Sequence, residues 1–419
     1  MLSPFPVKEN TINVSGIKND FPLLTRNKSL SYLDSASTTQ KPKCVIDSLV
    51  SFYETSNANA HRGVYDLSNK ATVILESARE TVRGHIGARS TEEIIFTKST
   101  TESLNIVAHS FTGLKAEKKS GSSDFILLGG AEHHANIVPW QVAAKSLGLR
   151  IDYIPILDDG SLDLEKTKEL LEKKPVLISF SHISNVLGTI NPVKEITKMA
   201  HAQGVPVVID GAQAVSHTKV DVSDIGCDFY AFSGHKAYGP MGIGVLYAKT
   251  DHIKSMTPFL TGGGMIDEVF SDYSTYTDGP QKFEAGTQSI ADAYGLDTAI
   301  KYIRSIGIEN IESLERELIQ YTESSLRKIE GLNVLGPLTN RSAPIFSFTL
   351  DNIHPHDLAT VLSEKNIAVR AGHHCSQHTM KRFGLNATTR ASFGVYNTTE
   401  DIDALLDGIK FANSLFLRN

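Results

Sequence analysis

A lysine and an aspartate follow two consecutive strand-like runs, and together they could serve an aldehyde cofactor. Asp210 ends the run VPVVID, and Lys236 comes just after the run DFYAFSG. Because ligands bind at the carboxyl ends of parallel strands, we expect the two side chains at one site. A lysine in a partly apolar cleft has a lowered pKa and acts as an amine nucleophile and base, whereas a surface lysine stays protonated. Taken alone, Lys236 is more simply interpreted as an ordinary loop lysine, but the surrounding segments favour a reactive amine.

Those segments offer the parts that pyridoxal phosphate needs, namely an acid for the pyridine nitrogen, phosphate donors and a flat ring for stacking. An ionised Asp210 would keep the pyridine nitrogen protonated. The run IIFTKSTTESLN predicts a strand, then hydroxyls, then a helix whose N-terminus could bind the phosphate. The further candidates are Thr100 and Thr101 as phosphate ligands, Gln213 for the ring oxygen, Ser233 and His235 as donors beside the lysine, and His133 or His134 of AEHHAN as the stacking imidazole.

Each of these residues also has a structural interpretation. Asp210 and the threonines could cap helices. Paired histidines are more often structural residues or metal ligands, but the chain has no nearby cysteine and no HExxH spacing, so no metal site is expected. The run GPMGIG precedes a predicted strand, so it does not fit a dinucleotide-binding motif.

Cys375 in NIAVRAGHHCSQH is the candidate for a second reactive group. Arg370 and three nearby histidines favour its thiolate, which is the nucleophilic form. Cys44 and Cys227 are expected to be buried and inert, and the absence of a CxxC pair argues against a disulfide framework. Arg390 in NATTRASFG could bind a substrate carboxylate in a bidentate manner, or form a surface salt bridge.

Seven short apolar runs between residues 92 and 249 predict the scaffold that positions these groups: EEIIF, DFILLGG, LRIDYIPI, PVLISF, VPVVID, DFYAFSG and GIGVLYAK. Their alternation with helical segments is typical of an α/β fold with crossover helices. Continuous apolar runs suit strands that are buried on both faces, so we predict a mostly parallel central sheet.

The rest of the chain predicts a smaller α+β unit. The Gly-rich TGGGMIDEV and the polar SDYSTYTDGPQ indicate a functional loop region. Helical stripes then run from residue 296 toward residue 330, followed by short strand candidates and a last amphipathic helix. We therefore predict a large cofactor-binding α/β domain of residues 25–295 and a small α+β domain of residues 1–24 and 296–419, which carries Cys375.

The composition excludes several classes of protein. Lys and Arg number 41 against 47 acids, and the net charge of -6 provides no general basic field for nucleic acid. No stretch approaches the roughly 20 apolar residues of a membrane span. The N-terminal segment lacks an apolar h-region and carries acids early. We expect a soluble, cytoplasmic protein in a reducing compartment, with no nucleic-acid or membrane partner.

Nearly end to end, the chain resembles the group II cysteine desulfurases of the SufS type, within the fold-type I pyridoxal-phosphate enzymes. The matching segments are YLDSAST, NANAHRGVYDLS, TTESLN, AEHHANIVPWQ, SNVLGTINP, DGAQAVSH, CDFYAFSGHKAYGPMGIGVLY, GGGMI, FEAGTQS, RAGHHCSQ and TRASFGVYNT. The resemblance implies a fold-type I architecture and conversion of L-cysteine to L-alanine, with Lys236 covalently linked to pyridoxal 5'-phosphate and a persulfide on Cys375.

The resemblance also implies a role for each candidate residue. It implies that Asp210 pairs with the pyridinium, that Gln213 contacts the ring oxygen and that His133 stacks on the ring. The remaining implied contacts are Thr101, Ser233 and His235 to the phosphate, Thr287 to the phosphate from a second subunit of a homodimer, Asn185 and Arg390 to the substrate carboxylate and cofactor, and His61, Arg62 and Arg370 near the substrate.

The same resemblance implies a mechanism and a partner. Lys236 removes the α-proton of the bound cysteine, and the Cys375 thiolate attacks its sulfur. The persulfide then passes to an acceptor protein of the SufE type or of the zinc-bound SufU type for iron–sulfur cluster assembly. His356 in IHPHD resembles the histidine that engages a zinc-bound acceptor, and a solvated turn histidine is the other interpretation. Ser376 and the hydroxyl-rich SASTT depart from the family pattern without removing a catalytic group.

Three other functions fit parts of the sequence. A selenocysteine lyase would use the same fold, because selenium leaves more readily than sulfur and needs the thiol less. A cofactor-bound scaffold could present sulfur without turnover, although Lys236, Asp210 and Cys375 together argue against it. A Cys-His hydrolase built on Cys375 would need no cofactor.

Overall fold

A seven-stranded sheet forms the centre of the computed structural model, which describes residues 14–61, 63–111, 125–337 and 343–416. The strand order is β2-β8-β7-β6-β5-β3-β4, and β8 alone runs antiparallel to its neighbours. The strands are β2 (Ile94–Thr97), β3 (Phe125–Gly129), β4 (Arg150–Ile154), β5 (Ile178–Ser181), β6 (Val207–Asp210), β7 (Phe229–Ser233) and β8 (Gly244–Ala248). Each of the seven apolar runs overlaps one strand, so the predicted α/β fold with a mostly parallel sheet is confirmed.

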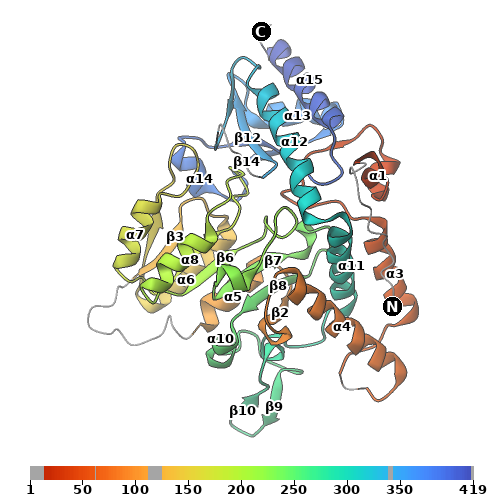
Figure 1. The fold of residues 1–419 in the computed structure, drawn as a ribbon, viewed down its shortest axis with the longest axis vertical. Helices are drawn as coiled ribbons and strands as arrows, with labels where there is room; N and C mark the ends of the chain where they lie inside the picture. Colours follow the sequence, from red (N-terminus) through yellow and green to blue (C-terminus); the bar gives the residue numbers. More distant parts are fainter. Residues whose placement is uncertain (1–13, 62, 112–124, 338–342, 417–419) are drawn as a thin grey trace.

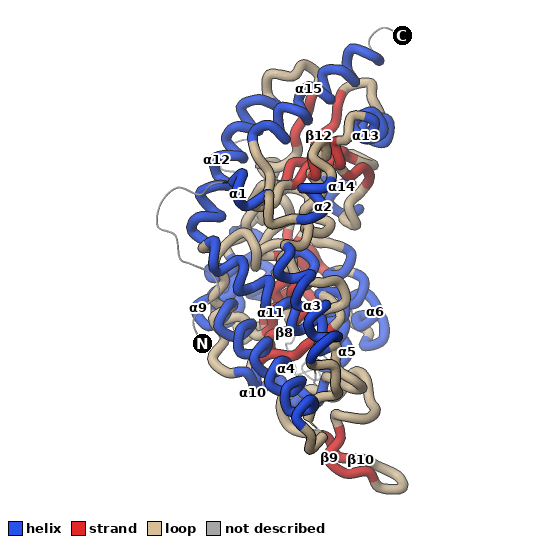
Figure 2. The backbone as a smooth tube through the Cα atoms, turned by 90° about the vertical axis from the view of Figure 1, so that its right-hand side faces the viewer, coloured by secondary structure: helices blue, strands red, loops and turns tan. Residues whose placement is uncertain are grey.

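Helices cover both faces of this sheet, which explains the continuous apolar runs (Figures 1 and 2). Along β6, Val207 and Ile209 pack into one hydrophobic cluster and Val208 into the other. The first face is covered by α3 (Lys43–Thr55), α4 (Asp66–His85), α7 (Leu164–Glu172), α8 (Val193–Ala202), α9 (Val222–Ile225) and α11 (Ile290–Ile306), and the second by α5 (Thr100–Ser110), α6 (Val138–Leu147) and α10 (Thr250–Ser255). Because the helices cover the two faces, a ligand site can form at the edge where the parallel strands end.

A second, antiparallel sheet lies at the other end of the molecule with the order β11-β12-β15-β14 (Figure 2). Its strands are β11 (Leu332–Val334), β12 (Ile345–Leu350), β14 (Arg370–Gly372) and β15 (Thr388–Ser392), and its helices are α12 (Ile308–Leu326), α13 (Pro355–Glu364), α14 (Gln377–Arg382) and α15 (Thr399–Phe416). Short elements tie the two parts together: α1 (Val14–Lys18), α2 (Pro22–Arg26), and β1 (Ser31–Tyr32), which pairs with β13 (Ile367–Ala368). The predicted compact ending is therefore present.

The domain boundaries remain a prediction. The hydrophobic clusters do show where the chain leaves the core of the large sheet and enters the core of the small sheet. Helix α11 crosses position 295 without a break and contributes Ile303 to the cluster under the large sheet. Ile311 of α12 belongs to that cluster, whereas Leu314 belongs to the cluster under the small sheet. We infer that the chain crosses from the large α/β part to the small α+β part within α12.

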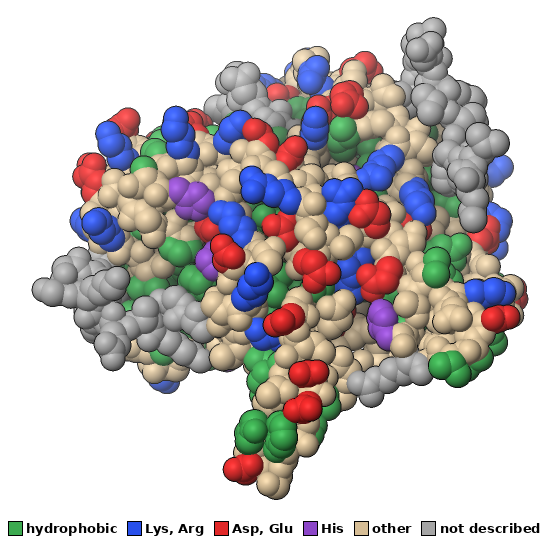
Figure 3. All heavy atoms as spheres, turned by 60° about the horizontal axis from the view of Figure 1, so that its bottom comes forward, with side chains coloured by type: hydrophobic (Ala, Val, Ile, Leu, Met, Phe, Trp, Pro, Cys, Tyr) green, Lys and Arg blue, Asp and Glu red, His purple; other side chains and the backbone are tan. Residues whose placement is uncertain are grey.

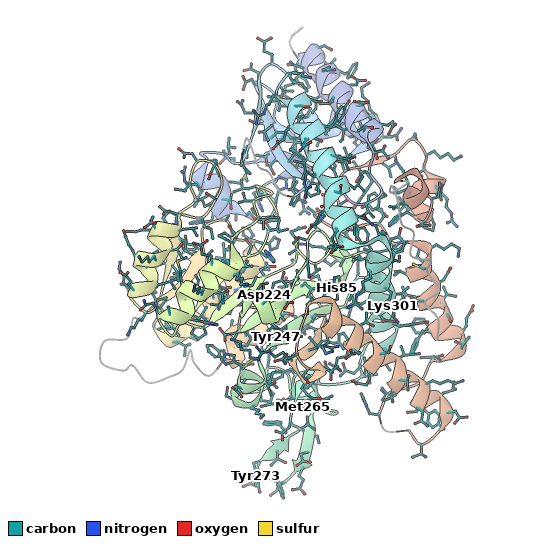
Figure 4. The ribbon with its side chains drawn as sticks, in the orientation of Figure 1. His85, Asp224, Tyr247, Met265, Tyr273 and Lys301 are labelled. Atoms are coloured by element: carbon teal, nitrogen blue, oxygen red, sulfur yellow. The ribbon has the colours of Figure 1, made fainter. Side chains whose placement is uncertain are left out.

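The region after β8 differs from the predicted loop. It contains an antiparallel hairpin of β9 (Ile266–Val269) and β10 (Ser274–Tyr276), which stands out from the body of the molecule (Figures 1 and 3). Cross-strand pairing satisfies its backbone groups, which the polar sequence alone did not indicate. Tyr273 lies at the far end of the hairpin and Met265 at its base (Figure 4).

Candidate active site

A polar cavity of about 200 Å³ lies at the carboxyl ends of the central strands. It collects side chains from β6 and β7, from the start of α5 and from the small sheet. Of the residues singled out in the sequence, those lining it are Thr100, Thr101, His133, Asn185, Asp210, Gln213, Ser233, His235, Lys236, Arg370 and Arg390. Residues separated by more than two hundred positions thus form one site, where the ends of parallel strands predict a ligand.

Lys236 is delivered to the cavity by a short 3-10 turn, Gly234–Lys236, directly after β7. The Ser216 hydroxyl donates to the Lys236 carbonyl at 3.1 Å and so helps to hold the turn. Burial lowers the pKa of Lys236 to about 8, while the Asp210 carboxylate opposes that shift. About one amine in ten is therefore unprotonated at pH 7, far more than for an exposed lysine, and the unprotonated form is the one that nucleophilic and base chemistry require.

The peptide before Lys236 is held by a clamp that sequence reasoning missed. Three groups of the SASTT segment donate to the His235 carbonyl: the Thr39 backbone N–H at 3.0 Å and the Thr38 and Thr39 hydroxyls at 3.1 Å each. Lys41 Nζ adds a fourth contact at 2.9 Å. Burial lowers the pKa of Lys41 to about 7. The hydroxyl-rich composition of this segment was the only signal for the clamp.

Asp210 presents a buried carboxylate that fits a protonated pyridine nitrogen. Its side chain is 5% exposed, and the Ala212 backbone N–H donates to Oδ1 at 2.9 Å. Burial raises the pKa of Asp210, and the backbone hydrogen bond and Lys236 oppose that shift. A Cβ at Gly211 would lie 2.0 Å from the Tyr230 ring, so the turn after Asp210 requires glycine. A cationic ring nitrogen would supply the charge partner that keeps the acid ionised.

The phosphate end of the site fits as well. Helix α5 begins at Thr100, whose backbone N–H donates to the Ser233 hydroxyl at 2.8 Å. The Thr101 side chain lines the cavity at the same helix N-terminus. A Cβ at Gly244 would lie 2.6 Å from the Ser99 backbone, so glycine permits the close approach of helix and strand. Hydroxyls beside a helix N-terminus form a donor set suited to a phosphate group.

The paired histidines have separate places. His133 lines the cavity, accepts a hydrogen bond from the Ala135 backbone N–H at 3.0 Å, and has a pKa that burial lowers to about 3. It is therefore a neutral imidazole, suited to stacking on an aromatic cofactor. The His134 backbone N–H instead donates to the Cys375 carbonyl at 2.6 Å.

The segment that carries Cys375 is hydrogen-bonded to the cavity wall. Asn185 Nδ2 donates to the His374 carbonyl at 2.9 Å, and the Ser376 hydroxyl donates to Asn185 Oδ1 at 3.1 Å. His374 and Cys375 have left-handed φ values of 53° and 55°, so this backbone is strained and held in place by its contacts. Cys375 itself is half-buried, and its neighbour His374 lines the cavity.

Arg390 is hydrogen-bonded on several sides through its two Nη atoms. It is 2% exposed, with Nη1 donating to the Asn185 carbonyl at 2.9 Å and Nη2 to Asp34 Oδ1 at 3.1 Å. Its Nε–H has no hydrogen-bond partner within the described part of the chain. Because Arg390 also lines the cavity, its guanidinium is suited to an anionic ligand.

Cys375, Thr287 and His61 are not among the described residues that line this cavity in a single chain. Thr287 is exposed before α11, and His61 is exposed before α4 with its backbone N–H bonded to Thr72. Arg62 lies outside the described residues. Conversely, Ser37, Ser99, Ser181 and Ala212 line the cavity without having been singled out.

The lowered pKa of Lys236 predicts how the chain reacts with pyridoxal phosphate. Because only the unprotonated amine attacks an aldehyde, the rate of covalent reconstitution should rise about tenfold per pH unit below the pKa of about 8 and level off above it. Stopped-flow absorbance between pH 6 and pH 10 measures the rate, and borohydride reduction with peptide mapping identifies the lysine. A rate that keeps rising to pH 10 would indicate an ordinary exposed amine instead.

Comparisons with known proteins agree with this geometry. The family model for class-V aminotransferases matches residues 31–405. A probable cysteine desulfurase of Halalkalibacterium halodurans is 47% identical over 408 residues, 97% of this chain and 99% of that protein. A cysteine desulfurase of Haloferax volcanii is 42% identical over 97% of this chain and 98% of its own length.

Solved structures give the same result. The apo structure of a cysteine desulfurase from Thermococcus onnurineus matches with a TM-score of 0.91 at 38% identity, over 97% of this chain and 99% of that one. The Escherichia coli cysteine desulfurase CsdA matches with a TM-score of 0.89 at 36% identity, over 97% and 100% of the two chains. The chain therefore belongs to the class-V aminotransferase family, among its pyridoxal-phosphate-dependent cysteine desulfurases.

Proposed function

We propose that this enzyme is a group II cysteine desulfurase of the SufS type, which collects the sulfur of L-cysteine as a persulfide on Cys375 for iron–sulfur cluster assembly. The observation that carries the proposal is the attachment of the Cys375 segment to the cavity of Lys236. Asn185 is bonded to the residues on both sides of Cys375, and His134 is bonded to the Cys375 carbonyl. The segment that carries the thiol is thereby fixed to the wall of the cavity that contains the Lys236 amine.

In the proposed reaction, Asp210, Lys236 and Cys375 each have a separate role. Bound pyridoxal phosphate supplies an electron-withdrawing ring that makes the α-proton of an attached amino acid acidic. Asp210 keeps the ring nitrogen protonated, and Lys236 takes the α-proton and returns it to the carbon skeleton. The Cys375 thiolate attacks the substrate sulfur, so that an S–S bond forms as the C–S bond breaks. L-cysteine and the Cys375 thiol thus become L-alanine and the Cys375 persulfide, with no net redox change.

Mass analysis after incubation with L-cysteine tests this proposal. Free alanine should accumulate, and the peptide that contains Cys375 should gain the mass of one sulfur atom. The peptide that contains Cys227 should be unchanged, because that thiol is fully buried and burial raises its pKa. Alanine without added sulfur on the Cys375 peptide would contradict the assignment of the acceptor thiol.

We further propose a homodimer in which Thr287 reaches the partner subunit's site. The supporting observations are exposed apolar side chains where a second subunit could pack: Ile46, Val50 and Tyr53 on α3, and Val269, Phe270, Tyr273 and Tyr276 on the hairpin. Figure 3 shows hydrophobic and acidic side chains together on the projecting hairpin. Apolar residues gathered on such a surface commonly mark a protein interface.

Mixing two inactive variants tests the shared site. If Thr287 serves the partner subunit, a heterodimer of Lys236→Ala and Thr287→Arg has one doubly altered site and one intact site. Random subunit exchange should then restore up to about a quarter of wild-type activity, while each variant alone stays inactive. Absence of recovery, despite heterodimers detected by native mass spectrometry, would argue that Thr287 serves its own subunit.

We also propose that a SufU-type, zinc-bound protein accepts the sulfur through His356. His356 is exposed at the start of α13, and its ring stacks with that of His354 at a centroid distance of 6.0 Å. An exposed imidazole can serve as a zinc ligand. Replacing His356 with alanine should reduce the stimulation of turnover by a zinc-bound acceptor about tenfold or more, but leave stimulation by a zinc-free SufE-type acceptor unchanged. If the zinc-bound acceptor stimulates His356→Ala as strongly as the wild-type enzyme, His356 is a solvated turn histidine.

A further inference from the structure

The Ser37 hydroxyl lies where two arginine side chains from neighbouring strands meet. Arg370 Nη1 donates to Ser37 Oγ at 2.7 Å, and Arg390 Nη2 donates to the same atom at 2.8 Å. The hydroxyl in turn donates to Asp34 Oδ1 at 2.6 Å. Since a serine hydroxyl has one donor hydrogen and two acceptor lone pairs, its hydrogen-bonding capacity is fully used.

Without such a link the two arginines would repel each other. Arg370 of β14 and Arg390 of β15 are directly opposed in an antiparallel pair, an arrangement that destabilises a sheet when the charges are alike. Burial lowers the pKa of Arg390, the Asp34 carboxylate opposes that shift, and Arg370 adds to it. Asp34 therefore offsets one positive charge, and Ser37 provides the oxygen that both guanidinium groups share.

The segment that carries Ser37 is itself fixed to both sheets. The Ala36 backbone N–H donates to the Ser392 hydroxyl of β15 at 2.9 Å, and Gln213 Nε2 donates to the Ala36 carbonyl at 2.7 Å. The Ser37 hydroxyl is thus placed independently of the two arginines. Its position determines how far apart their guanidinium groups stand.

We propose that Ser37 is a positioning residue that holds Arg370 and Arg390 as a preformed receptor for the α-carboxylate of the amino-acid substrate. All three residues line the same cavity as Lys236, and the Nε–H of Arg390 has no partner within the described part of the chain. One excess positive charge therefore faces the cavity. A receptor held in place before binding loses little conformational entropy when the ligand arrives. This inference rests on the proposed function, because it assigns the group that binds the substrate carboxylate.

A pair of ligands that differ only in the carboxylate tests the inference. L-alanine and ethylamine both carry an amine that can react at the cofactor, but only L-alanine has a carboxylate. Their binding to the holoenzyme is measured by the change in the visible absorbance of the cofactor. Ser37→Ala should weaken L-alanine binding about tenfold and leave ethylamine binding unchanged, since a hydrogen bond to a charged group is lost. With L-cysteine, KM should rise by the same factor while kcat stays within about twofold.

Ser35→Ala is the matched control. It removes a hydroxyl from the same segment, but that hydroxyl is bonded to the Tyr396 hydroxyl at 2.8 Å and to neither arginine. Ser37→Thr keeps the acceptor oxygen and should restore wild-type affinity for L-alanine. If Ser37→Ala does not fold, Ser37→Cys, which offers a weak sulfur acceptor, replaces it in the same comparison.

The outcomes separate this inference from the proposed function. Weaker binding of L-alanine alone, in Ser37→Ala but not in Ser35→Ala, supports the inference. Three results would overturn the inference: equally weaker binding of L-alanine and ethylamine, unchanged binding of L-alanine, or the same effect in Ser35→Ala. Failure of the wild-type enzyme to release alanine from cysteine contradicts the proposed function instead, whichever way the Ser37 comparison turns out.

Discussion

Replacing Lys236 with alanine is expected to lower kcat for alanine release from L-cysteine by about 10⁴-fold, the upper end for loss of a general acid–base group. The reason is that Lys236 lines the same cavity as Asp210, and burial lowers its pKa to about 8. Under the proposed function, its loss would remove both the covalent link to the cofactor and the base for the α-proton. Steady-state alanine release measures kcat, and borohydride reduction measures covalent attachment.

Lys41 provides the control, because it is a second half-buried lysine close to the same peptide. Burial lowers its pKa to about 7, and Nζ contacts the His235 carbonyl at 2.9 Å. The variant Lys41→Gln should still carry a cofactor that borohydride fixes to Lys236. If Lys41→Gln loses the covalent cofactor while Lys236→Ala keeps it, the assignment of the two lysines is wrong.

The second large effect is expected for Cys375→Ala, which should lower turnover of L-cysteine on the order of 10³-fold, as for loss of a catalytic nucleophile. Turnover of L-selenocysteine should fall less than about tenfold, because a selenium leaving group depends less on attack by the thiol. Parallel assays of alanine release from the two substrates measure the difference. The same assays on the wild-type enzyme give kcat/KM for each substrate. The ratio of the two values shows whether the enzyme prefers cysteine or selenocysteine.

Cys44→Ala is the matched control for this variant. Cys44 is half-buried in α3, and burial raises its pKa, so it is not expected to form a nucleophilic thiolate. Activity on both substrates should stay within about twofold of wild type, as for a substitution away from the site. Equal loss of the cysteine and selenocysteine activities in Cys375→Ala would indicate that the thiol supports the structure of the segment and not sulfur removal.

The sequence alone determined the central sheet and predicted many of the residues that line the cavity. Runs such as VPVVID predict strands buried on both faces, and Asp210 and Lys236 follow two such strands, so their meeting at one edge is a consequence of local pattern and chain direction. The threonines at the start of α5 were predicted for the same reason.

Only the tertiary structure decided which groups contact one another across the chain. It separated His133, in the cavity wall, from His134, which hydrogen-bonds to the Cys375 segment. It placed Ser37 between Arg370 and Arg390 and formed a hairpin where the polar sequence had predicted a loop. Strand and helix periods arise from neighbouring residues, whereas the contacts of Ser37 and of His134 join residues hundreds of positions apart. Their geometry is set by the packing of the two sheets, which no local spacing encodes.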